Sequence, residues 1–410
     1  MHIIFACDEN PRDINTWSNI PYLLLSELEA RGFEVTTIDL REHRLMKLLW
    51  RLTAGFVHRL LHPDSSYSFF RSFPHSFLTT SKLERALKRH REGAAFMINM
   101  SISHSPRQAS IPVVLISDWT YAHYIESFLA REPNRAERST IARDRAVMAR
   151  ASWVVTLFPC SADRINRDLG VKRAVFLGHP VNRHPATRNC HTEDATGSLI
   201  SAHDTNRQDL SSQGQPMLLN LLFVGRPKYL EGLRLLLAVL PHLRHRYCLR
   251  LDVIGMNRDE VVAGLPTGVS VTSDGVGVRF LGYLSKADED QRQAYDEALK
   301  RADLFISATP TWGPFSAMVE AMSWRTAVVT PLYEEFVAVF EDYPRFTIPL
   351  MRCSEAAMIE AICEAASSPA HLKKLQDAAA GAVAQSTWTR FVDRLIAQAA
   401  LPATLLPDAE

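Results

Sequence analysis

The stretch LNLLFVGRPKYLEG, residues 219–232, has the form of a strand followed by a tight turn and the start of a helix. Its first half is an uninterrupted apolar run that ends at Gly225, and Arg226 and Lys228 follow before the helical segment. An apolar run without alternation is typical of a parallel strand that helices cover on both faces. The stretch therefore predicts one strand–turn–helix step of an α/β domain.

The same step recurs on both sides of this stretch. Short apolar and β-branched runs alternate with segments of helix length. The runs before it are HIIFA (2–6), FEVTTI (33–38), AAFMINM (94–100), PVVLIS (112–117), WVVTLF (153–158) and RAVFLG (173–178). The runs after it are RLDVIG (250–255), VRFLG (278–282), DLFIS (303–307) and TAVVT (326–330). We therefore predict an α/β protein built from two Rossmann-like domains that face each other across a cleft.

Length and composition agree with two domains. A chain of 410 residues exceeds one hydrophobic core, and domains of roughly 150 to 200 residues predict two. The segment 186–216 is polar and lacks periodicity, so we expect a linker or insertion there. It separates an N-terminal Rossmann-like domain, residues 1–185, from a C-terminal one, residues 217–385.

Charge and cysteine content exclude several classes of protein. Lys and Arg number 46 against 45 Asp and Glu, which argues against a nucleic-acid binder that works by bulk electrostatics. No apolar run is long enough to span a bilayer, and the apolar part of the N-terminus is too short for a signal peptide. The 6 cysteines are scattered, which indicates reduced thiols and a cytoplasmic protein rather than a disulfide frame or a zinc site.

Two cations follow the strand that ends at Gly225. Arg226 offers a planar fork of donors that suits a phosphate, and Lys228 adds a point charge. At the carboxyl end of a parallel strand they could stabilise a diphosphate. The alternative is an ordinary basic turn that pairs with Glu231.

The N-terminal half offers a loop and a carboxylate. The loop 7–21 opens a helix, with Ser18 as its expected N-cap and Asn15 beside it, and a helix N-terminus favours anions. The alternative is a capped surface loop. Asp118 ends a buried strand, where it could act as a general base or orient a substrate, or simply cap the next helix.

The stretch TWGPFSAMVEAM, residues 311–322, contains one acid, Glu320. Pro314 suits the first helical turn, and the apolar positions fall on one helical face. Glu320 is expected to point away from that face. Taken alone, it is either a solvated helix glutamate or a ligand contact.

The order of these segments resembles the retaining nucleotide-sugar glycosyltransferases of GT-B fold, the group 1 type also called glycosyltransferase family 4. The resemblance covers nearly the whole chain. The segments that carry it are WSNIPYLLLSELEARGFEV (17–35), ADRINRDLGVKRAVFLGHPVN (162–182), LLFVGR (221–226), VRFLGYL (278–284), ADLFISATPTWGPFSAMVEAMSWRTAVVTP (302–331) and STWTRFVDRLI (386–396). The last segment looks like the terminal helix that crosses back to the N-terminal domain, which implies a final element over 386–410.

The resemblance implies roles for individual residues. Glu320 matches the second of two family glutamates separated by seven residues, and it would hold the nucleotide ribose; Gly225 and Arg226 would bind phosphate. Gly282 and Tyr283 lie in the nucleobase segment.

The sequence departs from the family pattern at several places, among them Arg325 and Ala327, which replace the glycine and proline that usually follow the donor-binding helix. Trp312 stands where the family has the first glutamate, and Glu231 stands where it has a lysine before glycine. Asp118 falls where many members have a histidine in the catalytic cleft.

The implied function is transfer of a sugar from a nucleotide-diphosphate sugar to the hydroxyl of a glycan or lipid-linked acceptor. The enzyme would be a retaining, metal-independent hexosyltransferase of polysaccharide biosynthesis that needs no cofactor. Two alternatives remain open. One is a non-catalytic GT-B protein that binds a nucleotide or glycan or supports a partner enzyme, which the missing glutamate favours. The other is a nucleotide-sugar epimerase on the same fold.

The segment RLMKLLWRLTAGFVHRLLH, residues 44–62, predicts a basic amphipathic helix. Its polar face carries Arg44, Lys47, Arg51, Gly55, His58 and His62, and its apolar face carries Leu45, Leu48, Leu49, Leu52, Phe56 and Leu60, with Trp50 placed to sit at an interface. Such a helix can lie on anionic lipid at the inner face of a membrane. The alternative is a core-packed helix with a solvated basic face.

Overall fold

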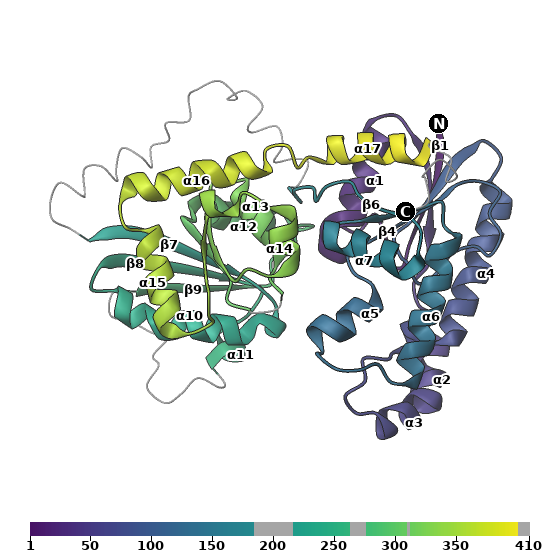
Figure 1. Ribbon diagram of the computed structural model, residues 1–410, viewed down its shortest axis with the longest axis horizontal. Helices are drawn as coiled ribbons and strands as arrows, with labels where there is room; N and C mark the ends of the chain where they lie inside the picture. The colour runs from purple at the N-terminus through teal and green to yellow at the C-terminus, as the bar shows by residue number, and fades with distance from the viewer. Residues whose placement is uncertain (184–215, 263–275, 310–311, 401–410) are drawn as a thin grey trace. The chain divides into compact units, whose positions relative to one another are not determined.

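The computed structural model describes residues 1–183, 216–262, 276–309 and 312–400. They form two compact units, one made of Met1–Pro180 with Thr387–Glu410 and the other of Val181–Ser386. Each unit is a sheet flanked by helices (Figure 1). The expected linker 186–216 lies outside the described residues except for Pro216.

The first unit contains a parallel sheet of order β2-β1-β3-β4-β5-β6. Its strands are β1 (His2–Cys7), β2 (Glu34–Asp39), β3 (Ala94–Asn99), β4 (Val113–Ser117), β5 (Trp153–Thr156) and β6 (Ala174–Phe176). The central strands are buried along most of their length, as their unbroken apolar runs predict. After β1 the chain moves to β2 on one side, and β3 then occupies the other side of β1.

The helices of the first unit include the last helix of the described chain. They are α1 (Ile20–Ala30), α2 (Arg44–Leu52), α3 (Ala54–Leu61), α4 (Phe73–His90), α5 (Tyr121–His123), α6 (Arg135–Arg150), α7 (Pro159–Leu169) and α17 (Trp388–Ala400). Polar contacts hold α17 on α1, because Arg31 pairs with Asp393 at 2.6 Å and Thr389 donates to Glu27 at 3.0 Å.

The second unit contains a parallel sheet of order β12-β11-β10-β7-β8-β9. Its strands are β7 (Met217–Val224), β8 (Tyr247–Ile254), β9 (Val276–Gly282), β10 (Leu304–Ile306), β11 (Ala327–Thr330) and β12 (Thr347–Pro349). The runs read from the sequence are all found as strands, and the predicted fold class is confirmed. β12 was missed because it ends in a proline, which argues against a strand in the sequence but which an edge strand tolerates.

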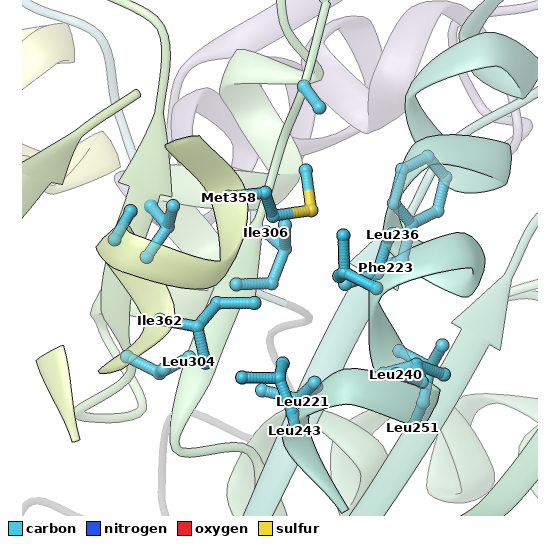
Figure 2. Packing of buried hydrophobic residues seen from close by; sticks show 14 of the residues in the cluster. Leu221, Phe223, Leu236, Leu240, Leu243, Leu251, Leu304, Ile306, Met358 and Ile362 are labelled. Atoms are coloured by element: carbon cyan, nitrogen blue, oxygen red, sulfur yellow. The ribbon is translucent and has the colours of Figure 1, made fainter. Parts of the chain in front are cut away.

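One hydrophobic core joins this second sheet to its helices. The helices are α10 (Leu230–Leu243), α11 (Arg258–Val262), α12 (Glu289–Arg301), α13 (Phe315–Met322), α14 (Glu334–Val339), α15 (Glu355–Ala365) and α16 (Pro369–Val383). Phe223 of β7 and Leu240 of α10 meet Ile362 of α15 within one buried cluster (Figure 2). This core fixes the sheet edge at which the candidate site lies.

The basic amphipathic segment folds differently from the single helix that the sequence predicted. The helices α2 and α3 are separated at Thr53, whose φ of −120° and ψ of −106° are not helical. Gly55, in the first turn of α3, lies against Trp50, and a Cβ there would lie 2.5 Å from the indole ring. Trp50 itself packs on Tyr67 and Phe69, so it anchors α2 to the unit instead of standing at an interface.

The apolar side chains of these two helices are not part of the core. Eight of them are more than half exposed: Leu45, Leu48, Leu49, Leu52, Phe56, Val57, Leu60 and Leu61. The core-packed alternative for this segment is therefore wrong. Among the described helices, none combines the length and apolarity needed to cross a bilayer.

Candidate functional site

The strand order of the second unit places its expected ligand site. The sheet order changes direction between β7 and β10, because β8 lies on one side of β7 and β10 on the other. In open α/β sheets, ligands bind outside the carboxyl ends of strands at such a switch point. The two segments at that edge are residues 225–229, after β7, and the turn 312–314 that precedes α13.

The backbone at the end of β7 is closely packed. Gly225 donates its N–H to the carbonyl of Ile254 at 2.9 Å. A Cβ on Gly225 would lie 2.9 Å from the Phe223 ring and 3.0 Å from the Tyr229 ring, so the position requires glycine. The chain therefore turns at Gly225 directly into Arg226, which is exposed.

Aromatic rings hold both predicted cations at this edge. The Lys228 ammonium lies 4.0 Å from the centroid of Trp312 and 4.9 Å from that of Tyr229. The Arg226 guanidinium lies 5.4 Å from the centroid of Tyr283. Cation–π contacts of this kind contribute about 0.5–2 kcal/mol each and orient the cation without neutralising it. The simple alternative, a basic turn paired with Glu231, is not formed, because Glu231 pairs with Arg234 at 2.7 Å instead.

Trp312 replaces a family glutamate, and the structure shows what it does. It brings its ring to Lys228 across the switch point. The hydroxyl of Tyr229 donates to the Gly313 carbonyl at 3.4 Å, which links the same two segments a second time. Burial raises the pKa of Tyr229 above its ordinary value, so the hydroxyl stays protonated and can donate.

Two buried hydroxyls beside Gly313 were not singled out from the sequence. A Cβ on Gly313 would lie 3.0 Å from the Tyr333 hydroxyl and 3.2 Å from Oγ of Ser307. Neither oxygen has a hydrogen-bond partner among the described residues. Buried polar atoms without partners are uncommon and mark places where a ligand or water is held. Ser307 ends the run DLFIS, which was the one local signal available.

The remaining predicted residues of this unit lie at the end of β9. Gly282 has a φ of +62°, and a Cβ there would lie 2.5 Å from Oδ1 of Asn257. Tyr283 follows it with 54 % of its surface exposed, so its ring is open to a ligand face. The guanidinium of Arg226 connects Tyr283 to the β7 segment. The structure thus brings Arg226, Lys228, Gly225 and Tyr283 to one edge.

Glu320 is placed differently from the sequence expectation. It is 3 % exposed and lies in a buried ion pair, so the alternative of a solvated helix glutamate is wrong. Lys286 donates to Oε1 at 2.6 Å and to Oε2 at 2.8 Å, and the Tyr295 hydroxyl donates to Oε2 at 3.0 Å. Lys286 also donates to the Asn182 carbonyl at 3.0 Å. Burial raises the pKa of Glu320, while the Lys286 ammonium acts in the opposite direction.

The network around Glu320 also holds the start of the second unit. Besides the Asn182 contact, Arg183 donates to the Ser323 carbonyl at 2.8 Å and lies 4.4 Å from the Trp324 ring centroid. Ser323 directly follows α13, the helix that carries Glu320. The segment before the undescribed residues is therefore fastened to α13 from two sides.

The predicted residues of the first unit lie on the loops after β1 and β4. Oδ1 of Asp118 accepts the N–H of Trp119 at 2.8 Å, and the cap of α5 is Thr120, so the capping alternative for Asp118 is wrong. Asn15 donates to Oδ1 of Asp13 at 3.2 Å, which makes it part of a local turn.

Ser18 is not the N-cap that the sequence predicted. Its φ of 53° and ψ of 32° are left-handed, whereas a capping side chain needs an extended backbone. Asn19 occupies the cap position with a φ of 71°, and its side chain turns back to the Ile14 carbonyl. Trp17, with a φ of 35°, makes three consecutive left-handed residues ahead of α1.

One family model matches part of the chain. Residues 219–368 match the family model described as "Glycosyl transferases group 1". No curated protein matches the sequence.

Three solved structures share the fold over nearly the whole chain. A glycosyltransferase from Rickettsia africae ESF-5 is 12 % identical, with a TM-score of 0.59 and 97 % of each chain covered. Sucrose-phosphate synthase from Thermosynechococcus elongatus is 16 % identical, with a TM-score of 0.59, and the match covers 97 % of this chain and 99 % of that one. UDP-GlcNAc 2-epimerase from Neisseria meningitidis, bound to UDP-GlcNAc, is 13 % identical, with a TM-score of 0.53 and the same coverage. At these identities the likeness shows the fold, so the resemblance to GT-B proteins is confirmed.

Proposed function

We propose that this chain, whose residues 219–368 belong to the group 1 glycosyl transferases, moves a sugar from a nucleotide-diphosphate sugar to an acceptor hydroxyl. The observation that carries the proposal is the pair of cations after β7. Arg226 and Lys228 stand at the switch point of the matched domain, each over an aromatic ring. An aromatic ring orients each cation without neutralising its charge, so we expect both to attract an anionic ligand.

The donor would bind on the second unit. Arg226 and Lys228 would stabilise the negative charge that develops on the departing diphosphate, which is preorganised electrostatic catalysis. Gly225 lets the phosphate approach the backbone, and the exposed ring of Tyr283 offers a stacking surface to the nucleobase beside Gly282. Because the two cations supply the positive charge, the proposed reaction needs no metal ion.

Glu320 is the proposed ribose contact, but its carboxylate already has hydrogen-bond partners. Both of its carboxylate oxygens already accept hydrogen bonds from Lys286 and Tyr295. A ribose hydroxyl would therefore share or displace one of these donors. If neither gives way, Glu320 is a structural residue.

The acceptor would bind on the first unit. Asp118 follows β4 at the carboxyl edge of the first sheet, where it could orient or deprotonate the acceptor hydroxyl. Asn15 lies on the loop after β1 at the same edge and could contribute to acceptor or phosphate binding. Ser18 belongs to that loop. It would contribute through its left-handed backbone, which shapes the loop, and not as a helix cap.

Contact with a membrane surface belongs to the same proposal. The exposed apolar side chains of α2 and α3 lie beside the exposed cations Arg44, Arg51 and Arg59. Apolar side chains gain free energy when they leave water, and arginines are attracted to anionic headgroups. A peripheral enzyme at the inner face of a membrane, acting on a lipid-linked glycan, fits this surface.

Incubation with a panel of nucleotide sugars tests the proposal. Nucleotide release that depends on an added glycan or lipid-linked acceptor identifies a transferase, and the anomeric configuration of the product decides between retention and inversion. Hexose donors should be used first, and uridine nucleotides lead the panel because one structural neighbour is bound to UDP-GlcNAc.

The same panel separates the two rival functions. An epimerase is favoured by that same neighbour and would isomerise the sugar without an acceptor. A non-catalytic protein would bind the nucleotide without turnover. Either outcome refutes the transferase proposal.

A further inference from the structure

The first unit has its own topological switch point, between β1 and β3. The sheet order β2-β1-β3 places β2 and β3 on opposite sides of β1. Asp8 follows β1 at this point, and the loop 100–105 follows β3, whose last residue is Asn99. Ligands bind outside the carboxyl ends of such strands.

The loop after β3 is buried although it is polar. Its sequence is MSISHS, and each of its six residues is buried, as is Asn99 before it. Loops ordinarily run over the surface, because solvent satisfies their polar groups. A buried polar loop at the end of a strand therefore indicates a role in binding as well as in joining two strands.

Several polar atoms in this region lack hydrogen-bond partners. They are Oδ1 of Asp8, Oδ1 of Asn99 and both ring nitrogens of His104 and of His75, counted among the described residues. Nε2 of His104 lies 3.9 Å from Oδ1 of Asp8, and the rings of His104 and His75 are 5.0 Å apart. Each unsatisfied buried group costs stability, so such a cluster is retained where a ligand supplies the missing partners.

The charge state of the cluster indicates the kind of ligand. Burial lowers the pKa of His104 to about 3, so its imidazole is neutral at pH 7 and offers one donor and one acceptor. Burial raises the pKa of Asp8 to about 7, so this carboxyl is only partly ionised. Arg71, whose charge acts on both groups, is itself paired, since it lies 3.7 Å from Asp144 and 3.8 Å from the Tyr121 ring centroid. Nearly neutral donors and acceptors suit a hydroxyl group better than a phosphate or an ammonium.

One member of the cluster can be reached from outside. The Asp8 side chain is 21 % exposed, whereas that of His104 is 1 % exposed. A ligand therefore meets Asp8 first, and His104 stands behind it. Asn99 helps to fix this arrangement, because its amide donates to the His104 carbonyl and so shapes the loop.

We propose that Asp8 binds a hydroxyl of a neutral, polyhydroxylated ligand at the β1–β3 edge, with His104 and Asn99 as positioning residues behind it. The ligand hydroxyl donates to the Asp8 carboxylate. The inference rests on the proposed function in one respect, since the ligand is then the acceptor of the transfer. It assigns the acceptor contact to Asp8, a residue that no family motif matched here.

Binding can be measured without turnover. The probe is a mixture of the methyl α-glycosides of glucose, galactose, mannose and N-acetylglucosamine, observed by saturation-transfer NMR with the full-length protein. Wild type should saturate at least one glycoside. Asp8→Leu should weaken that binding by about tenfold or more, because it removes the oxygen that accepts the hydrogen bond from the ligand hydroxyl. The melting temperature of Asp8→Leu should stay the same or rise, because a buried carboxyl with an unsatisfied oxygen is replaced by an apolar side chain of similar size.

Two further variants serve as controls. Asp8→Asn retains an acceptor oxygen and should keep binding within a few-fold of wild type. Glu9→Leu removes the same charge from the neighbouring exposed position and should bind like wild type.

The inference is overturned if wild type saturates none of the four glycosides. It is also overturned if Asp8→Leu binds as well as wild type, or if Asp8→Leu unfolds and Asp8→Asn binds no better than background. If the protein binds a glycoside but releases no nucleotide from any nucleotide sugar, the transferase proposal is refuted and the Asp8 site is kept. Turnover that is unaffected in Asp8→Leu refutes this site and leaves the transferase standing.

Discussion

Removal of one partner of the Lys286–Glu320 pair is expected to destabilise the second unit strongly. Both groups are less than a tenth exposed, and their closest atoms are 2.6 Å apart. In Lys286→Met the carboxylate would keep only the Tyr295 hydroxyl at 3.0 Å, and the Asn182 carbonyl would lose its donor. Breaking a buried ion pair from one side costs about 3–5 kcal/mol, because the other charge stays in a medium that solvates it poorly.

The double variant Lys286→Met/Glu320→Leu supplies the comparison. Replacing both members of a buried pair with apolar residues is often neutral, so the double variant should be more stable than either single variant. The coupling free energy from this cycle should reach about 2 kcal/mol or more. Tyr295→Phe, which removes one neutral donor, should cost only about 1–2 kcal/mol.

Urea unfolding followed at the transition of the second unit measures these differences. Nucleotide affinity, measured by calorimetry and corrected for the folded fraction, then decides the role of Glu320. A large loss of stability in Glu320→Gln with normal affinity makes the residue structural. A preserved transition with lost affinity makes it the ribose contact. Single variants that each cost less than about 1 kcal/mol and add without coupling would refute the reasoning about the pair.

Three other predictions address the rest of the chain. Arg226→Ala should weaken nucleotide-diphosphate binding by about 2–3 kcal/mol through loss of a charge-assisted hydrogen bond, and unchanged affinity in calorimetry removes Arg226 from the donor site. Leu60→Glu should reduce co-sedimentation with anionic vesicles, whereas Met351→Glu, at an exposed apolar residue of the second unit, should not; equal effects contradict a membrane role for α3. The burial that lowers the pKa of His104 from 6.5 to about 3 makes the folded state resist its protonation, so stability is lost as pH falls through 6.5 toward 3 by at most about 5 kcal/mol. In His104→Leu the free energy of unfolding in urea should therefore fall less steeply between pH 6.5 and pH 3. An identical pH dependence in wild type and variant shows that another group is responsible.

The sequence alone determined the secondary structure and the class of fold. Strands covered on both faces require continuous apolar runs, and these runs survive in the sequence as a local pattern. Gly225 and the cations after it were found for the same reason, since a strand end, a turn and a helix start are set by neighbouring residues. The edge strand β12 was missed because its last residue is a proline, which counts against a strand in a local pattern.

Tertiary structure decided the environment of individual side chains. Helical periodicity placed Glu320 off the apolar face of α13, but its burial depends on Lys286, which is 34 positions away in the sequence. Periodicity also found the apolar faces of α2 and α3, yet it could not tell whether anything covers them. Ser18 had the composition of a cap and lacked the backbone conformation for one.

The cluster around Asp8 shows the same limit most clearly. Nothing in the sequence pairs Asp8 with His104, because two strands and several helices lie between them. The parallel sheet brings the ends of β1 and β3 together, and burial then changes the protonation of both groups. Local pattern determines which segments become strands and helices, because those preferences act between near neighbours. Burial and charge depend on which distant segments meet, and only the folded chain fixes that.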